Sequence, residues 1–347
     1  MVTDPARRDN RKRSIVVFVN NGVMLPMFVA ASLLARQDQV ELSRTFTTGQ
    51  TLSYNVKTHL LAEEKNIAMS FFLPQEFDVN YAFTMKVEDA KPDGFATVLY
   101  ERPTMTFIEG ETNEAPPKTT VNKSGWKLRL TLSPINEITD IKDLSEKKKD
   151  DKGGKGDKGG GYLFRDGIIN KAAQSNFIGK MIQELQSLAM FVGGLDSALD
   201  FSPKLPLDDI KPGDTWKKTV SYQPRELKGT EKQAVQRLDY TYTYNGLADA
   251  EGKKVHRVTA VLDLDTDAAK FINQAMDTKP EESGLKELRL QMKATIVYDL
   301  DEKTKTTLKA TAESKGGFSI FVTQSPDQAV VEEKMAGKSV MTLAGIK

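Results

Sequence analysis

The chain has 347 residues, of which 39% are hydrophobic and 28% charged, and its formal net charge at pH 7 is +1. These values are ordinary for a globular protein, and the balanced charge argues against a nucleic-acid surface. The chain contains no cysteine, which excludes disulfides, thiolate nucleophiles and cysteine-ligated zinc.

The first 35 residues have the features of an export signal. Basic residues cluster between Arg7 and Arg13, and an apolar stretch then extends from Ile15 to Ala35 and ends in small residues. This order is typical of a secretory signal peptide, although the stretch is also long enough for a membrane anchor. The sequence therefore predicts that residues 1–35 are a signal peptide or an anchor. The protein is then exported, either periplasmic or extracellular, or is held at the membrane by this segment.

Alternation of apolar and polar residues dominates the rest of the chain. It is clearest within Phe77–Glu88, Trp126–Leu132, Leu238–Tyr244 and Leu288–Tyr298. A period of two puts one set of side chains on a buried face and the other in water, as in antiparallel sheets covered on one side. We therefore predict a mainly β protein with long antiparallel strands.

Two parts of the chain resemble each other. Gly49–Val56 and Gly213–Val220 each begin with a turn glycine and continue as a strand, and a second glycine turn follows each at Gly94 and Gly252. The matching order predicts two antiparallel, half-barrel-like β units, residues 36–145 and 202–347, that are internally duplicated. Chance similarity between two β meanders is the alternative.

The segment between the two units divides into a loop and a helix. Residues 146–161 are Lys, Asp, Gly and one Glu, with no apolar side chain, which predicts a disordered loop. Within residues 162–201, apolar side chains recur every three or four positions from Ile168 to Val192. This spacing predicts one amphipathic helix, whose apolar stripe has to cover the apolar face of a sheet.

Motifs that would indicate an enzyme are absent from the sequence. It has no phosphate-binding loop, no nucleophile-elbow serine, no paired-histidine zinc helix and no dinucleotide fingerprint. His59 and His256, the two histidines, lie at similar positions of the two units. They would have to meet to form a site, whereas a lone strand histidine is usually a sheet residue. We therefore expect no enzyme, no catalytic residue, no metal site and no cofactor.

Candidate ligand-binding residues lie on the helix and on one strand. Aromatic side chains at alternate positions of a strand either line a binding concavity or stabilise the sheet by cross-strand pairing. The candidates are Phe177, Met181, Leu185 and Leu188 in the helical stripe, and Tyr240, Tyr242 and Tyr244 on the strand.

The export signal, the long alternating strands and the helix together resemble the half-barrel of periplasmic lipoprotein carriers. They also resemble exported bacterial proteins of unknown function with two β units. In those, a phrase similar to Lys211–Trp216 opens the second unit and one similar to Ile296–Leu300 precedes a late hairpin. The resemblance implies a concave apolar sheet face that can hold acyl chains beneath a helix. It implies no catalytic residue.

Two functions therefore remain open. The first is an exported, non-enzymatic binding protein that encloses an apolar or lipid-like ligand between the sheet and the helix. The second is a structural or interaction protein of the cell envelope with no small-molecule ligand. The expected partners are accordingly an apolar ligand or an envelope protein, without nucleic acid. Contact with a membrane is expected only through an uncleaved N-terminal segment.

Overall fold

The computed structural model describes residues 39–65, 76–110, 117–123, 126–144, 202–222, 236–270, 273, 279, 281 and 284–347. The predicted signal or anchor, the predicted loop 146–161 and the predicted helix Ile168–Val192 lie outside these residues. So do the candidate side chains of that helix, Phe177, Met181, Leu185 and Leu188.

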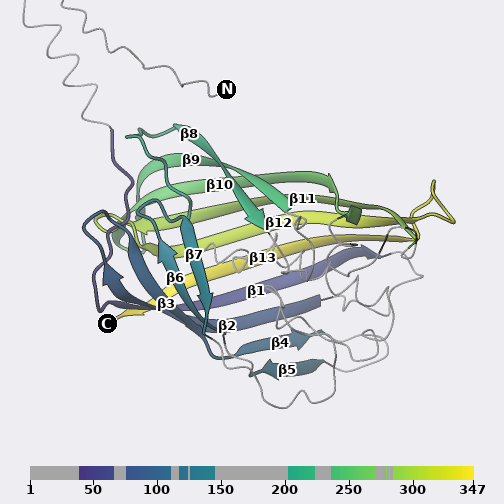
Figure 1. Cartoon of the computed structure of the whole chain (residues 1–347), viewed down its shortest axis with the longest axis horizontal. Coiled ribbons are helices and arrows are strands. Elements are labelled where there is room, and N and C mark those ends of the chain that lie inside the picture. The colour runs from purple at the N-terminus through teal and green to yellow at the C-terminus, as the bar shows by residue number, and fades with distance from the viewer. Residues whose placement is uncertain are drawn as a thin grey trace, which may run out of the picture. The chain divides into compact units, whose positions relative to one another are not determined.

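The described residues form one antiparallel sheet, which confirms the prediction of a mainly β protein (Figure 1). Its strands are β1 (Thr51–Lys65), β2 (Glu76–Ala90), β3 (Ala96–Arg102), β4 (Met105–Glu109), β5 (Lys118–Asn122), β6 (Trp126–Leu132), β7 (Ile138–Asp143), β8 (Thr215–Tyr222), β9 (Gln236–Ala250), β10 (Lys253–Asp267), β11 (Leu285–Asp301), β12 (Thr307–Val322) and β13 (Val331–Ile346). The strand order is β7-β6-β3-β2-β1-β13-β12-β11-β10-β9-β8, and β4 pairs with β2 and β5.

The two predicted units join in this sheet through β1 and β13. These strands pair from Leu52 opposite Ile346 to Lys65 opposite Glu333. The first strand of the first unit therefore lies beside the last strand of the second unit, and the sheet is continuous from β7 to β8.

Alternation along the strands separates an apolar face from a charged face. In the 17-residue strand β11, buried and exposed side chains alternate from Leu288 to Ile296. The buried set belongs to one hydrophobic cluster that extends over the whole sheet, and we call this side the inner face. The outer face carries ion pairs such as Arg257–Asp299, with Nε 2.7 Å from Oδ1.

Similar turns open the two units. Gly49 and Gly213 precede β1 and β8 with φ of 86° and 93°, in the region that favours glycine. Their N–H groups donate to Val87 O at 2.8 Å and Tyr244 O at 2.7 Å in the second strand of each unit. The β2–β3 and β9–β10 ladders both shift register just beyond these residues. The two units thus share the backbone geometry of their opening turns.

The last hairpins of the units also correspond. The β6–β7 turn contains Asn136 with φ 62°, and the β11–β12 turn contains Lys305 with φ 56°. A register shift lies beside each turn, at Leu132 in β6 and Leu300 in β11. Descent of the two units from one duplicated unit stays a prediction, for which these matched irregularities are the structural support.

A close approach of backbones in the middle of the sheet requires glycine in β12. A Cβ atom on Gly316 would lie 2.3 Å from the carbonyl oxygen of Gln291 and 2.8 Å from Cα of Met292. No side chain fits at such distances without a shift of the backbone. Gly316 therefore allows β12 to lie close against β11, as strand glycines often do.

The two edges of the sheet meet at the end that contains these turns. Lys218 of β8 is paired with Glu137 of the β6–β7 turn, with Nζ 2.8 Å from Oε1. Trp216 of β8 donates from Nε1 to Lys204 O at 2.7 Å, and Lys204 donates from Nζ to Asn136 O at 2.6 Å. The sheet therefore curves until β8 reaches the opposite edge, and we call this region the turn end.

Candidate functional site

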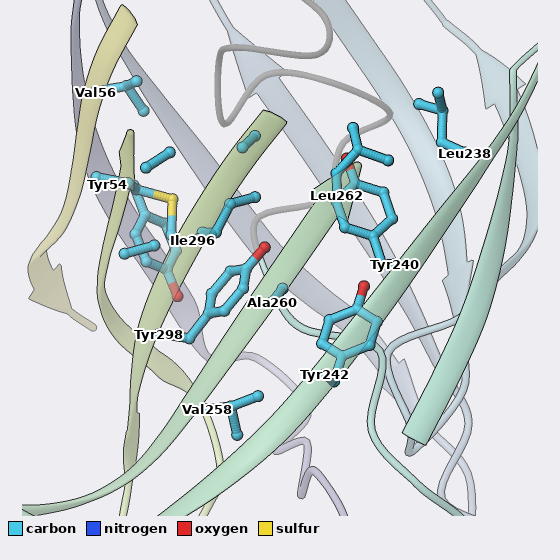
Figure 2. Packing of buried hydrophobic residues seen from close by; sticks show 14 of the residues in the cluster. Tyr54, Val56, Leu238, Tyr240, Tyr242, Val258, Ala260, Leu262, Ile296 and Tyr298 are labelled. Atoms are coloured by element: carbon cyan, nitrogen blue, oxygen red, sulfur yellow. The ribbon is translucent and has the colours of Figure 1, made fainter. Parts of the chain in front are cut away.

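The inner face is a continuous surface of apolar and aromatic side chains. Figure 2 shows part of it, where side chains from β1, β9, β10 and β11 project from the same side of the sheet. The residues labelled there are Tyr54, Val56, Leu238, Tyr240, Tyr242, Val258, Ala260, Leu262, Ile296 and Tyr298, all of which are buried. A strand of 17 residues spans roughly 55 Å at about 3.3 Å per residue, so the face is long.

A band of small side chains crosses the middle of the inner face. It comprises Ala294, Ala312, Ser314, Ser339 and Thr58, and we call it the small-residue band. Its members pair across β11, β12, β13 and β1, so the band is continuous. All five are buried, and the hydroxyls of Ser339 and Thr58 are hydrogen-bonded at 2.6 Å. These side chains are short compared with the aromatic and branched side chains elsewhere on the inner face.

A buried polar cluster lies at the turn end. Arg44, in the segment before β1, donates from Nη1 to Asn136 Oδ1 at 3.3 Å and to Ser202 Oγ at 3.5 Å. The Ser202 hydroxyl is hydrogen-bonded to Thr307 Oγ1 at 2.8 Å, and the Tyr54 hydroxyl donates to Thr307 O at 3.0 Å. Four segments that are distant in the sequence thus contribute polar groups to one place.

Arg44 is the charged member of this cluster. The residue is 5% exposed, and its Cζ atom lies 4.7 Å from the ring centroid of Phe46. Burial lowers the pKa of Arg44 and raises the pKa of Tyr54 to about 12. The phenol is therefore a neutral hydrogen-bond donor at neutral pH, and the guanidinium is the source of positive charge.

The three predicted tyrosines of β9 are all buried on the inner face. Tyr242 stacks on Trp216 of β8, with ring centroids 5.5 Å apart and planes at 11°. The Tyr244 hydroxyl is hydrogen-bonded to Nδ1 of His256 at 2.7 Å. These contacts are those of cross-strand pairs that stabilise a sheet. A ligand-binding role for Tyr240, Tyr242 and Tyr244 stays a prediction.

The two histidines do not come together. His59 is on the outer face of β1, where Nδ1 lies 2.8 Å from Asp78 Oδ1. His256 is buried in β10 and is hydrogen-bonded to Tyr244. Within the described part of the chain, no three His, Cys, Asp or Glu side chains are arranged to hold a metal ion. No helix among the same residues is long and apolar enough to cross a membrane.

Sequence reasoning did not select Arg44 or its neighbours. The available signal was the alternation of Val40, Leu42, Arg44 and Phe46, in which an arginine takes a position that belongs to the apolar set. The segment is too short and irregular to be recognised as a strand. Asn136 lies in the β6–β7 turn, Ser202 in the segment before β8 and Thr307 at the start of β12. Only the curvature of the sheet brings them together.

No family model and no curated protein matches the chain. Solved structures similar to it include one described as lipid–protein interactions in lipovitellin, at 10% identity and a TM-score of 0.40, covering 87% of this chain and 26% of that one. DynF from the dynemicin biosynthesis pathway of Micromonospora chersina is 9% identical, with a TM-score of 0.20 and coverage of 88% and 84%. LprF from Mycobacterium bovis is 11% identical, with a TM-score of 0.18 and coverage of 84% and 85%. The chain thus spans about a quarter of the lipovitellin chain. At TM-scores this low, no inference about function follows from the three structures.

Proposed function

We propose that the chain is an exported, non-enzymatic binding protein that holds an apolar or lipid-like ligand on its inner face. The observation that carries the proposal is the small-residue band. Support for export comes from residues 1–35, in which a basic cluster precedes an apolar stretch that ends in small residues.

The small-residue band needs something above it. Protein interiors are packed as densely as organic crystals, so short buried side chains leave depth that another apolar group has to fill. Beside the band the face rises to bulky side chains, including Ile296, Tyr298 and Met341, which are buried as well. Such a difference in side-chain size gives an apolar ligand a place to pack against the sheet.

The energetics of such binding are favourable but not excessive. Burial of one methylene group gains roughly 0.8 kcal/mol, so about twelve methylenes gain about 10 kcal/mol. Association and ordering cost an estimated 4–15 kcal/mol, which offsets much of this gain. An acyl chain alone would therefore bind moderately, and a polar contact at its end would add useful affinity.

The second candidate is a structural or interaction protein with no small-molecule ligand. It is favoured by the stacked Trp216–Tyr242 pair, because these two large aromatic side chains already pack against each other within the sheet. In this case the space above the small-residue band is filled by the protein itself as ordinary core. The predicted helix Ile168–Val192 is the segment with the apolar stripe for that role.

Substitution of Ala312 by leucine separates the two functions. In a ligand site the larger side chain occupies the ligand's space, so binding of cis-parinaric acid should fall at least tenfold with little change in stability. In a packed core the same change is overpacking, which typically costs about 1–3 kcal/mol. Ala82→Leu on the exposed outer face of β2 is the matched control, and it should alter neither property.

The measurements are fluorescence titration of the full chain with parinaric acid and urea unfolding of each variant. Native mass spectrometry of the purified protein should in addition show a co-purifying mass of lipid size. The binding function is wrong if three results occur together. Wild type binds no parinaric acid, wild type carries no such mass, and Ala312→Leu loses stability by the overpacking penalty. The structural function would then be the better explanation.

A further inference from the structure

We propose that Arg44 binds the anionic head group, a carboxylate or a phosphate, of the ligand that lies on the inner face. This inference rests on the proposed function and adds the chemical class of the ligand, an anionic amphiphile. The head group would sit at the turn end, and the apolar chain would extend along the sheet.

The first observation is that the guanidinium of Arg44 is buried without a matching charge. Among the described residues, its Nη1 atom donates to the neutral oxygens of Asn136 and Ser202, at 3.3 and 3.5 Å. Its Nε atom is buried and has no hydrogen-bond partner. Within the described residues, no carboxylate forms an ion pair with it. A donor and a positive charge are therefore both left available.

An arginine in this state is costly for the protein. The guanidinium stays protonated in proteins, so burial does not neutralise it. Buried charges are normally paired, because removal of an ion from water is unfavourable unless an opposite charge replaces the water. Arg257 shows the usual arrangement, since it donates from both Nε and Nη2 to Asp299, whose carboxylate is largely buried. Among the described residues, Arg44 has no such acid.

The geometry of the cluster fits an anion with several acceptor oxygens. The planar fork of an arginine matches two oxygens of a carboxylate or a phosphate. The hydroxyls of Ser202 and Thr307, which now bond to each other at 2.8 Å, are further donors within the same cluster. Tyr54 adds a phenol that remains protonated at neutral pH. All of these groups are uncharged except Arg44, so the anion meets no repulsion from them.

The position of Arg44 connects the cluster to the inner face. Leu42, two residues earlier on the same side of the segment, belongs to the hydrophobic cluster of the sheet. Tyr54 stacks on Phe83 of β2 with ring centroids 4.9 Å apart, and its hydroxyl reaches the polar cluster. A ligand whose head group binds at Arg44 therefore has apolar surface directly beside it. This arrangement suits an amphiphile better than a small free anion.

The test compares cis-parinaric acid with its methyl ester at pH 8, where the acid is ionised and the ester is neutral. Both are titrated by fluorescence into the full-length wild type, Arg44→Gln and Arg289→Gln. Arg289 is an exposed arginine of the outer face, paired with Asp265 at 3.0 Å, and serves as the matched control. Wild type and Arg289→Gln should bind the acid at least tenfold more tightly than the ester. Arg44→Gln should lose this preference and keep its affinity for the ester.

The outcomes distinguish the two proposals. Equal binding of acid and ester by wild type overturns the role of Arg44 and leaves the proposed function intact. If neither probe binds, the proposed function fails. A measurement with inorganic phosphate then shows whether Arg44 forms an anion site at all. A rise in melting temperature with phosphate in wild type but not in Arg44→Gln supports a site for a free anion, and no rise overturns the site altogether. If Arg44→Gln does not fold, the ratio of acid to ester affinity in wild type alone decides between these results.

Discussion

Asn136 is the residue on which the turn end depends most directly. It is buried, has φ 62°, and donates from Nδ2 to Pro203 O at 2.9 Å while its Oδ1 accepts from Arg44. Asn136→Gly tolerates the backbone conformation but removes both side-chain bonds. A buried group left without its partner costs about 1–3 kcal/mol. The bond to Arg44 is long and contributes near the lower limit, so we expect a total loss of about 2–4 kcal/mol.

Two further substitutions at Asn136 separate the contributions. Alanine loses the same bonds and also pays for a left-handed backbone, so Asn136→Ala should be about 1 kcal/mol less stable than Asn136→Gly. Aspartate keeps the conformational tolerance of asparagine and offers Arg44 a carboxylate. It loses the donor to Pro203 but gains a charge-assisted bond. Asn136→Asp should therefore be more stable than Asn136→Gly. The reverse order is expected if the charge of Arg44 is already paired.

Urea unfolding followed by circular dichroism measures the stability of each variant. The midpoints are compared with the same slope of unfolding free energy against urea concentration for all variants. The expected order of stability is wild type, aspartate, glycine, alanine. A glycine variant within about 0.5 kcal/mol of wild type would show that the Asn136 bonds contribute nothing net. The description of the turn end as a specific polar junction would then be wrong.

Three other predictions concern the sheet. Gly316→Ala should destabilise by at least about 1–3 kcal/mol because its Cβ meets backbone atoms, while Gly345→Ala, with open space around it, should be close to neutral in thermal unfolding. Burial, followed by the charge of Lys305, lowers the pKa of His256 from its ordinary 6.5. The unfolded state then binds the proton more readily, so the free energy of unfolding should fall as pH decreases below about 6.5, and His256→Gln should remove this slope. Arg257→Gln should cost about 1–3 kcal/mol because its partner carboxylate is largely buried. Its exposed counterpart Arg289→Gln should leave the urea midpoint unchanged.

The fold class could be predicted because it depends on local periodicity. The alternation in Leu288–Tyr298 and Leu238–Tyr244 places the same residues on the inner face as the structure does. The repeated glycine turns gave the starts of β1 and β8. The pairing of β1 with β13, in contrast, joins residues almost 300 positions apart. Periodicity states which side of a strand is buried and does not state which strand is its neighbour.

The candidate site could be predicted only in part. The tyrosines of β9 were recognisable as inner-face residues because they are large and lie on one side of one strand, and their ligand-binding role stays a prediction. The small-residue band was not, since alanine and serine have no distinctive pattern, and their meaning comes from the pairing of four strands. Arg44 was missed for a related reason. Its partner Asn136 belongs to a turn and Ser202 to the segment before β8, and the curvature of the whole sheet brings both to Arg44.

The location of Arg44 follows from the way in which the two units meet. The segment before β1 runs between the two corresponding hairpin turns, where Arg44 N donates to Pro134 O at 2.8 Å and Thr45 N donates to Thr304 O at 3.0 Å. The turns have similar backbones but different side chains, since Asn136 faces Arg44 whereas Lys305 donates from Nζ to Glu302 O at 2.6 Å. Two similar units can build a long apolar face by repetition, but a face of this kind has no preferred end for a ligand. In the proposed site, the buried guanidinium of Arg44 at the junction supplies that direction.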